Sequence, residues 1–318
     1  MGEEMQGIEG DTGWRKAIPE ARDRLQSRVL VTVVGILLTL ETVAILREVY
    51  SIWGEQNVRE HILLAEIAGI SLAFAGLVLS LRAATVSGSL FGGMICFLLV
   101  SGTASSQYTI VRSGLAPLAL LFVLTFLATS AGRREKAEVG LAEKRQGRSS
   151  AQVIANLSIA GLAVSGLGFG PVMRGEVCCG TPDYKVWVWP AMMVMCLAAL
   201  VEATADTVSS EIGQAFGGVP VMLAGLRRVD VGTDGAVTLV GSGAGIIAGA
   251  LVATVGVWAL RLSVIDGAIA FLAGIIGLFF DSLLGATVER RGWLGNDLVN
   301  FFSTVFAAAV ALGARWRI

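Results

Sequence analysis

Three carboxylates follow one another where a long apolar stretch of the sequence ends. Glu202, Asp206 and Glu211 come directly after an apolar run that closes at Leu200. On a helix, residues 202 and 206 lie one turn apart on one face, and Gly213 falls on the same face. Two carboxylates this close repel each other and are costly to desolvate at a membrane boundary, so a cation is expected beside them. The alternative is a helix end whose acids are solvated.

A further acid lies inside an apolar segment closer to the C-terminus. Asp281 is flanked by GIIGLFF and LLGA, and an ionisable residue within a membrane span indicates a functional site. Carboxylate oxygens suit Mg²⁺, which keeps several waters and takes its other ligands from carboxylates and substrate phosphates. The predicted magnesium ligands are Glu202, Asp206, Glu211 and Asp281.

Basic side chains supply the opposite charge, and neutral amide side chains follow them in the sequence. In KRQGRSSAQVIAN, the residues Lys144, Arg148, Gln152 and Asn156 recur every four positions and would share a helix face if the helix starts early enough. Arg and Lys both bind phosphate oxygens. The alternative for the basic residues is a role as membrane anchors, which explains the amides less well. The predicted catalytic residues are Asp206, Asp281, Lys144 and Arg148.

A glycine-rich turn and the polar start of the last apolar segment complete the predicted site. The turn VGTDG at 231–235 comes immediately before an apolar helix, where backbone N–H groups can bind an anion; the alternative is an ordinary turn. Asn296, Asp297 and Asn300 lie where they could cap the last helix or reach into the site. The predicted nucleotide- and phosphate-binding residues are Gly213, Gly232, Thr233, Asp234, Gly235, Gln152, Asn156, Asn300 and Ser87.

The elements that must position these residues are membrane helices. Of the 318 residues 54% are hydrophobic and 15% charged, whereas a soluble domain carries about 25% charged residues. A span needs about 20 mainly apolar residues. Segments that meet or approach this length lie at 29–49, 62–81, 88–104, 114–132, 151–170, 188–208, 236–260, 264–288 and 298–314. The sequence therefore predicts an all-α, polytopic membrane helix bundle with about nine transmembrane helices.

Glycine spacing and charge placement refine this prediction. Gly241, Gly245 and Gly249 are four residues apart, which predicts close helix packing. If the N-terminus is internal, the internal connecting segments hold about twice as many Lys and Arg residues as the external ones. This distribution favours an N-in, C-out topology. Residues 1–28 have no apolar core of a secretory signal. We expect them to form a cytoplasmic arm, and residues 29–318 to form one transmembrane catalytic domain.

The motifs resemble those of the phytyl-phosphate kinase family. ADTVSSEIG, VGTDGAVTLVG, DSLLGATVE and NDLVNFFST, with SGSLFGG and KRQGRSSAQVIAN, carry this resemblance between about Thr85 and Ala311. ADTVSSEIG is also similar to the Asp-containing signature of CTP-dependent lipid kinases such as dolichol and phytol kinases. Two family glycines are replaced, by Ala205 and Ala236. Family functional residues carry over to Asp206, Glu211, Asp234, Asp281 and Asn300.

The resemblance implies that a prenyl monophosphate, such as phytyl or geranylgeranyl phosphate, and CTP give the prenyl diphosphate and CDP. A phosphate monoester is largely dianionic at pH 7 because its second pKa is about 6, so it needs no histidine base. The expected partners are this lipid, the nucleotide and membrane lipids, with a homo-oligomer left open. Nucleic acid is not expected as a partner, although the net charge of −1 by itself says nothing about it.

Two other functions are compatible with the residues. Intramembrane acids also occur in ion-coupled transporters and lipid flippases, although no convincing internal repeat is present and the polar motifs gather at one membrane face. A cytidylyltransferase that attaches CMP to a lipid phosphate would need similar groups. We expect a multi-pass protein of the bacterial inner membrane, with the site facing the cytoplasm.

Overall fold

The computed structural model describes residues 18–51, 58–104, 108–133, 136, 147–165 and 183–317, and for 48–51, 58–61 and 183–187 it describes the backbone alone. Seven helical segments of this part are long and apolar enough to cross a membrane, and two apolar helices are shorter. The long helices are α1 (Glu20–Ser51), α2 (Val58–Ser80), α3 (Val86–Thr103), α8 (Asp183–Phe216), α9 (Leu239–Leu260), α10 (Val264–Leu284) and α11 (Asn296–Arg315). The shorter ones are α4 (Leu115–Ser130) and α6 (Ser150–Val164).

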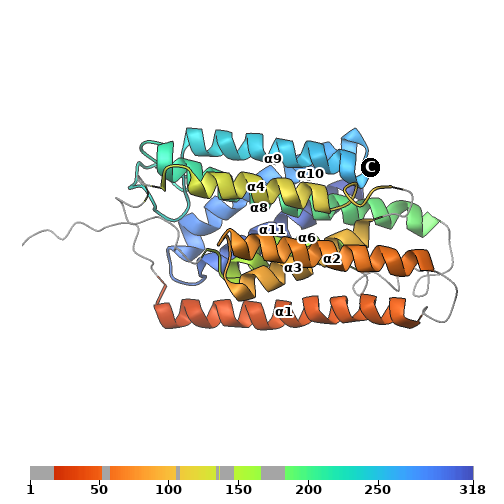
Figure 1. Ribbon diagram of the computed structural model, residues 1–318. Coiled ribbons are helices and arrows are strands. Elements are labelled where there is room, and N and C mark those ends of the chain that lie inside the picture. Colours follow the sequence, from red (N-terminus) through yellow and green to blue (C-terminus); the bar gives the residue numbers. More distant parts are fainter. Residues whose placement is uncertain are drawn as a thin grey trace, which may run out of the picture.

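These helices confirm the predicted fold class, because every predicted apolar segment corresponds to a helix. The helices run side by side along one direction, with α1 beginning at one end of the bundle and α11 ending at the other (Figure 1). The protein is a multi-pass membrane protein. The number of crossings and their orientation stay predictions, since α4 and α6 are shorter than the hydrocarbon core requires of an untilted helix.

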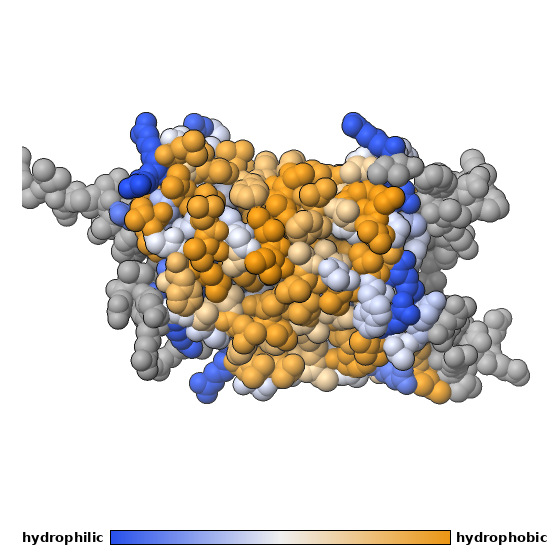
Figure 2. Space-filling view, turned by 90° about the horizontal axis from the view of Figure 1, so that it is seen from above, coloured by the Kyte–Doolittle hydropathy of each residue, from blue (hydrophilic) through white to orange (hydrophobic). Residues whose placement is uncertain are grey.

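The surface of the bundle is that of a protein surrounded by lipid. Apolar residues cover its middle, and hydrophilic residues gather towards its two ends (Figure 2). Large apolar side chains such as Leu72 and Ile247 point outward, with 72% and 65% of their surface exposed. A soluble protein rarely exposes an apolar surface of this extent.

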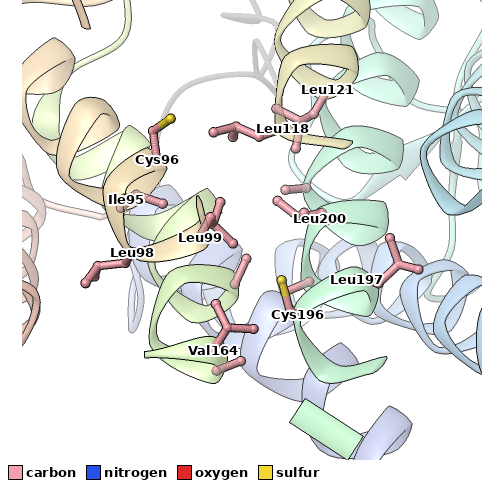
Figure 3. Close-up of a cluster of buried hydrophobic side chains, with 14 of the residues drawn as sticks. Ile95, Cys96, Leu98, Leu99, Leu118, Leu121, Val164, Cys196, Leu197 and Leu200 are labelled. Carbon is pink, nitrogen blue, oxygen red and sulfur yellow. The ribbon is translucent and has the colours of Figure 1, made fainter. Parts of the chain in front are cut away.

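Helix α8 is the central element, and small residues let its neighbours approach it. A Cβ atom added to Gly241 or Gly245 of α9 would lie 2.5 Å from the backbone oxygen of Ser209 or Ala205 on α8. The predicted packing role of these two glycines is thereby confirmed. On another side, Leu197 and Leu200 of α8 belong to the buried cluster that also includes residues of α3, α4 and α6 (Figure 3).

A short hairpin and a π-helix interrupt the helical pattern at one end of the bundle. Strands β1 (Val221–Met222) and β2 (Ala236–Val237) pair antiparallel between α8 and α9. After α10 the chain continues as the π-helix η2 (Gly285–Glu289). The turn 231–235 therefore leads into β2 and not directly into a helix as the sequence predicted. Helix α9 is capped instead by the Thr238 hydroxyl, which accepts from the N–H of Gly241 at 3.0 Å.

The first helix is tied to the loop before α11. Gln26 Nε2 donates to the carbonyl of Trp293 at 2.8 Å, and Ser27 Oγ donates to Asp297 Oδ2 at 2.6 Å. Helix α1 runs from Glu20 without a break at residue 28, and residues 1–17 lie outside the described part. The predicted arm and its boundary stay a prediction.

Candidate active site

Four carboxylates from three elements of the bundle gather at the hairpin end. Glu202 and Asp206 come from α8, Asp281 comes from α10 and Glu289 comes from η2. The charges of the other three act electrostatically on the Asp281 carboxylate. Glu202 and Glu289 are only 1% and 6% exposed. The predicted convergence of Asp206 and Asp281 on one site agrees with this arrangement, which we call the acid cluster.

The helices around the acid cluster approach closely because α10 presents glycines to it. A Cβ atom on Gly277 would lie 2.7 Å from Glu202 Cγ, so only glycine leaves room for this side chain. Ser303 of α11 donates a hydrogen bond of 2.6 Å to Glu202 Oε1. The second oxygen of Glu202 and the Oδ2 atom of Asp281 are buried without a hydrogen-bond partner. Buried carboxylate oxygens without partners are unfavourable unless a further group satisfies them.

A small polar cavity of about 130 Å³ opens beside the acid cluster. We call it cavity B. Its walls are the second half of α8, the turn before β2, the end of α10, η2 and the first residue of α11. The predicted site residues among those that line it are Asp206, Gly213, Gly232, Thr233, Asp234, Gly235 and Asp281. Sequence motifs that are far apart in the chain therefore do meet in one place.

The turn before β2 lies directly against the π-helix. Gly232 and Gly235 have φ angles of 89° and 74°, in the left-handed region where glycine is favoured. A Cβ on Gly285 would lie 2.7 Å from the backbone nitrogen of Gly235. A π-helix within an α-helical segment often marks a functional site. Here it brings Glu289 into the wall of cavity B, which the sequence did not predict.

A larger cavity of about 500 Å³ lies among α2, α3, α4 and α6 and reaches α8 at Ala203. We call it cavity A. Most of its lining is apolar and comes from α2, α3, α4 and α6, with side chains such as Phe74, Val78 and Leu118. Its rim at the hairpin end carries Arg82, Arg133 and Arg148. A pocket that is apolar along its length and cationic at one end fits a ligand with an apolar chain and an anionic head.

The backbone holds Arg148 firmly at this rim. The N–H of Arg148 donates to the carbonyl of Ala83 at 2.9 Å, and the N–H of Thr85 donates to the carbonyl of Arg148 at 2.9 Å. Arg82, next to this contact, has a φ angle of 54°, which is a strained backbone conformation for a residue other than glycine. The charge of Arg148 also acts on Asp206. This arginine therefore connects cavity A to the acid cluster.

Polar side chains continue the connection through the bundle. Asn156 lines cavity A and accepts a hydrogen bond of 3.4 Å from Asn300 Nδ2. The carbonyl of Asn300 accepts from Ser303 Oγ at 2.9 Å, which is the hydroxyl that reaches Glu202. Gln152 lines the same cavity and forms a capping box with Ser149 at the start of α6. Of the predicted amides, Gln152 and Asn156 thus line cavity A, and Asn156 and Asn300 connect it to Ser303 beside Glu202.

Two predicted site residues that the structure describes, Glu211 and Ser87, do not join this arrangement. Glu211 binds Lys136, whose Nζ atom lies 2.5 Å from Glu211 Oε2, so the prediction that Glu211 is a metal ligand is corrected: its carboxylate belongs to an ion pair. Ser87 is exposed in the first turn of α3, with its hydroxyl 3.3 Å from that of Thr85, and lines neither cavity. Lys144 lies outside the described residues.

Several residues of the site carried no clear signal in the sequence. Arg82 and Arg133 resemble ordinary cytoplasmic anchors, and Lys136 does too, although only 1% of it is exposed. Asn296 lines cavity B, next to Glu289. The polar start of the last segment had already indicated Asn296 as a residue that could reach into the site, whereas the burial of Lys136 depends on tertiary contacts.

The residues present fit a divalent cation that is held in part by a substrate. Within the part of the chain that the structure describes, no group of three or more His, Cys, Asp or Glu side chains is arranged to hold a metal ion alone. The buried, unpartnered oxygens of Glu202 and Asp281 are oxygen donors of the type that Mg²⁺ prefers. Because Mg²⁺ usually keeps waters and binds substrate phosphates, one or two carboxylates are sufficient.

Comparison with known proteins places the site within a matched region. The family model "Integral membrane protein DUF92" matches residues 69–308, which include the acid cluster and every residue that lines the two cavities. An uncharacterized membrane protein of Synechocystis sp. is 32% identical over 206 residues, which are 64% of this chain and 73% of that protein.

Two further relatives are less completely covered. Protein VTE6, chloroplastic, of Arabidopsis thaliana is 29% identical over 206 residues, or 63% of this chain and 58% of that protein. An uncharacterized membrane protein of Methanocaldococcus jannaschii is 33% identical over 116 residues, or 36% of this chain and 48% of that protein. The chain thus spans about half the length of these two relatives. No solved structure matches the chain.

Proposed function

This chain belongs to the integral membrane protein family DUF92, and from its two cavities we propose that it is a membrane-embedded kinase that transfers the γ-phosphate of CTP to a prenyl monophosphate. The observation that carries the proposal is that an apolar cavity with a basic rim and a polar cavity with an acidic wall approach each other at Arg148 and Asp206. A lipid phosphate and a nucleotide would each find a complementary site there.

The acceptor occupies cavity A. Its isoprenoid chain lies against the apolar residues of α2, α3 and α4, and its phosphate binds at the rim formed by Arg82, Arg133 and Arg148. The guanidinium groups offset the charge of the phosphate through charge-assisted hydrogen bonds. The motifs between about Thr85 and Ala311 resemble the phytyl-phosphate kinase family, and this resemblance supports prenyl phosphate as the acceptor.

The nucleotide phosphates occupy cavity B. A volume of about 130 Å³ is below the 300–1,000 Å³ of a pocket that encloses a whole small molecule, so the base and ribose extend out of it. Glu202, Asp206 and Asp281 would repel the phosphates unless a cation lies between them. These carboxylates would hold Mg²⁺ together with the nucleotide, and the ion would offset negative charge on the transferring group.

The transfer follows from this placement. An oxygen of the prenyl phosphate attacks the γ-phosphorus, a new P–O bond forms, and the bond from the γ-phosphorus to the oxygen that bridges the β- and γ-phosphates breaks, which releases CDP. No proton has to be removed when the attacking phosphate is dianionic. Positioning and charge stabilisation therefore supply most of the catalysis, with Arg148 beside the reacting groups and Lys144 as a further expected phosphate ligand.

The membrane position is part of the same proposal. Cavity B and the arginine rim of cavity A lie at the hairpin end of the bundle, where α3, α6, α9 and α11 begin and α4, α8 and α10 end. The distribution of Lys and Arg in the sequence favours a cytoplasmic location for this end, where nucleotides are available. We place the protein in the bacterial inner membrane.

A labelled nucleotide separates the candidate functions. Purified protein in lipid nanodiscs is incubated with phytyl or geranylgeranyl phosphate and with CTP labelled at the α- or the γ-phosphate. The kinase gives a prenyl diphosphate that carries the γ label, whereas a cytidylyltransferase gives a lipid that carries the α label. Absence of both products with every common nucleoside triphosphate would contradict the proposal and favour a transporter.

Two variants test whether the assigned site carries the activity. Asp206→Asn removes a charge from the acid cluster and is expected to lower kcat by at least about 100-fold, as expected for the loss of a group that stabilises transition-state charge. Glu66→Gln is the control, because Glu66 is an exposed acid of the membrane helix α2 and lines neither cavity. Equal activity of both variants would place the chemistry elsewhere.

A further inference from the structure

Cavity A has a definite length and one closed end. Seven residues of α4 between Leu118 and Ser130 line it at spacings of three and four, so a single face of the helix forms one wall. The distance from residue 118 to residue 130 along the axis is roughly 18 Å at about 1.5 Å per residue. The arginine rim lies at the Ser130 end, because α4 ends there and Arg133 follows.

The closed end is part of the hydrophobic core. Leu118 and Leu121 line the cavity and also belong to the buried cluster with Cys96, Leu99 and Leu200 (Figure 3). Leu118 and Leu121 of α4 are therefore shared between the cavity and the core, and we call this end of the cavity the floor. Native cores are closely packed, and a ligand chain cannot pass this floor without displacing core side chains.

An aromatic contact connects the two helices at the side of the cavity. The rings of Phe74 on α2 and Phe122 on α4 meet edge to face, with their centroids 5.7 Å apart, and both residues line the cavity. A chain that extends from the rim is thereby directed along α4 towards Leu118, and not sideways between α2 and α4.

Gly92 on α3 leaves space in the opposite wall. A Cβ atom on Gly92 would meet only Val153 Cγ1, at 3.9 Å, which is an ordinary contact. The next residue differs, because a Cβ on Gly93 would lie 2.9 Å from Ala75 Cβ on α2. Gly93 thus serves the packing of α3 against α2, whereas the missing side chain of Gly92 contributes open volume to cavity A.

We propose that Gly92 and Leu118 set the longest isoprenoid chain that the acceptor can carry. The inference rests on the proposed function, in which the acceptor is a prenyl phosphate with its head at the arginine rim. Because the rim fixes the phosphate, the distance to the floor at Leu118 limits the chain, and the width at Gly92 determines whether the chain reaches that floor. A larger residue at 92 shortens the accepted chain, and a smaller residue at 118 lengthens it.

The test measures both turnover and binding as a function of chain length. Geranyl, farnesyl, geranylgeranyl and longer polyprenyl phosphates are compared by kcat/KM and, without nucleotide, by the rise in thermal unfolding temperature that each causes. Gly92→Phe is expected to reduce the preference for geranylgeranyl over geranyl phosphate by at least about tenfold, since a few methylene groups in an apolar pocket discriminate by 10–200-fold. Leu118→Ala is expected to shift the optimum to a longer chain.

Matched controls come from the lipid-facing surface of α2. Gly76→Phe places the same ring where no atom lies within 4 Å, and Leu72→Ala removes the same side chain from a position that is 72% exposed. Neither control should alter the chain-length profile. Should Gly92→Phe not fold, Gly92→Val and Leu118→Ala test the same proposal independently.

The outcomes distinguish this inference from the proposed function. Prenyl phosphates could stabilise the protein with the predicted length dependence without being phosphorylated. This result would support the inference and contradict the proposed kinase activity. Phosphorylation with a profile that neither Gly92→Phe nor Leu118→Ala alters would support the kinase and overturn the inference. Absence of both stabilisation and turnover with every chain would overturn both.

Discussion

Ser303 on α11 and Glu202 on α8 are joined by a hydrogen bond of 2.6 Å, from the serine Oγ to the carboxylate Oε1, in the buried interior of the bundle. The same serine interacts with Asp281 on α10. One hydroxyl therefore lies between three helices at the acid cluster, and it contacts both carboxylates whose other oxygens have no hydrogen-bond partner.

Ser303→Ala is expected to weaken the site more than the fold. A hydrogen bond to a charged group contributes about 1.5–3 kcal/mol, which corresponds to a loss in kcat/KM of roughly 10–100-fold if the orientation of Glu202 matters for transfer. Two quantities are measured for each variant: the turnover of prenyl phosphate and the thermal unfolding temperature. Ser158→Ala is the matched control, because the Ser158 hydroxyl is buried without a hydrogen-bond partner. Full activity of Ser303→Ala would show that Glu202 is not part of the active arrangement.

Gly277→Ala is expected to disturb the same carboxylate from the opposite side. The added methyl group would lie 2.7 Å from Glu202 Cγ and 2.8 Å from Ala307 Cβ, and overpacking of this kind costs about 1–3 kcal/mol. We expect lower thermal stability together with lower kcat. Gly243→Ala in α9 is the control: with no atom within 4 Å, alanine should stabilise the helix by up to about 1 kcal/mol. Similar behaviour of both variants would contradict close packing at Gly277.

The ion pair between Lys136 and Glu211 is expected to stabilise the end of α4. Lys136 Nζ also donates to the carbonyl of Thr129 at 3.0 Å, and Thr129 lines cavity A beside Arg133. Removing one partner of a buried pair costs up to about 3–5 kcal/mol, and less here because the Glu211 side chain is 19% exposed. Lys136→Met should therefore lower the unfolding temperature and raise KM for the prenyl phosphate.

A double-mutant cycle checks this assignment. Adding Glu211→Met to Lys136→Met removes the unpaired charge, so the double variant should be more stable than Lys136→Met alone. If the two losses simply add, the pair contributes no interaction, and Lys136 would have to be buried for another reason.

The helices and the acid pair of α8 could be predicted from the sequence, because both depend on local periodicity. Apolar runs of span length become helices whatever their neighbours, and a spacing of four places Glu202 and Asp206 on one face. The convergence of Asp281 with these two acids was predicted because a carboxylate inside a membrane span is unfavourable unless a cation offsets its charge.

The parts that were not predicted depend on contacts between distant segments. Lys136 follows an apolar segment and reads as an anchor, and only the approach of α8 to the end of α4 gives it Glu211 as a partner. The π-helix at Gly285 lies against Gly235, a contact that no local pattern indicates. The walls of cavity A likewise come from α2, α3, α4 and α6, whose arrangement is set by packing.

Binding of Mg²⁺ is expected to depend on the nucleotide. In the part of the chain that the structure describes, no group of three or more acidic, histidine or cysteine side chains can hold a metal ion alone, whereas nucleotide phosphates supply further oxygen ligands. Titration of the protein with Mg²⁺, with and without a non-transferable CTP analogue, should give an affinity at least about tenfold higher with the analogue, which corresponds to ~1.4 kcal/mol of binding free energy.

Asp281→Asn should remove most of this gain in affinity. Asp266→Asn should retain it, because Asp266 lies at the other end of α10 and pairs with Arg315 at 2.7 Å. Tight Mg²⁺ binding without nucleotide would instead indicate a complete protein site and would require ligands beyond those described.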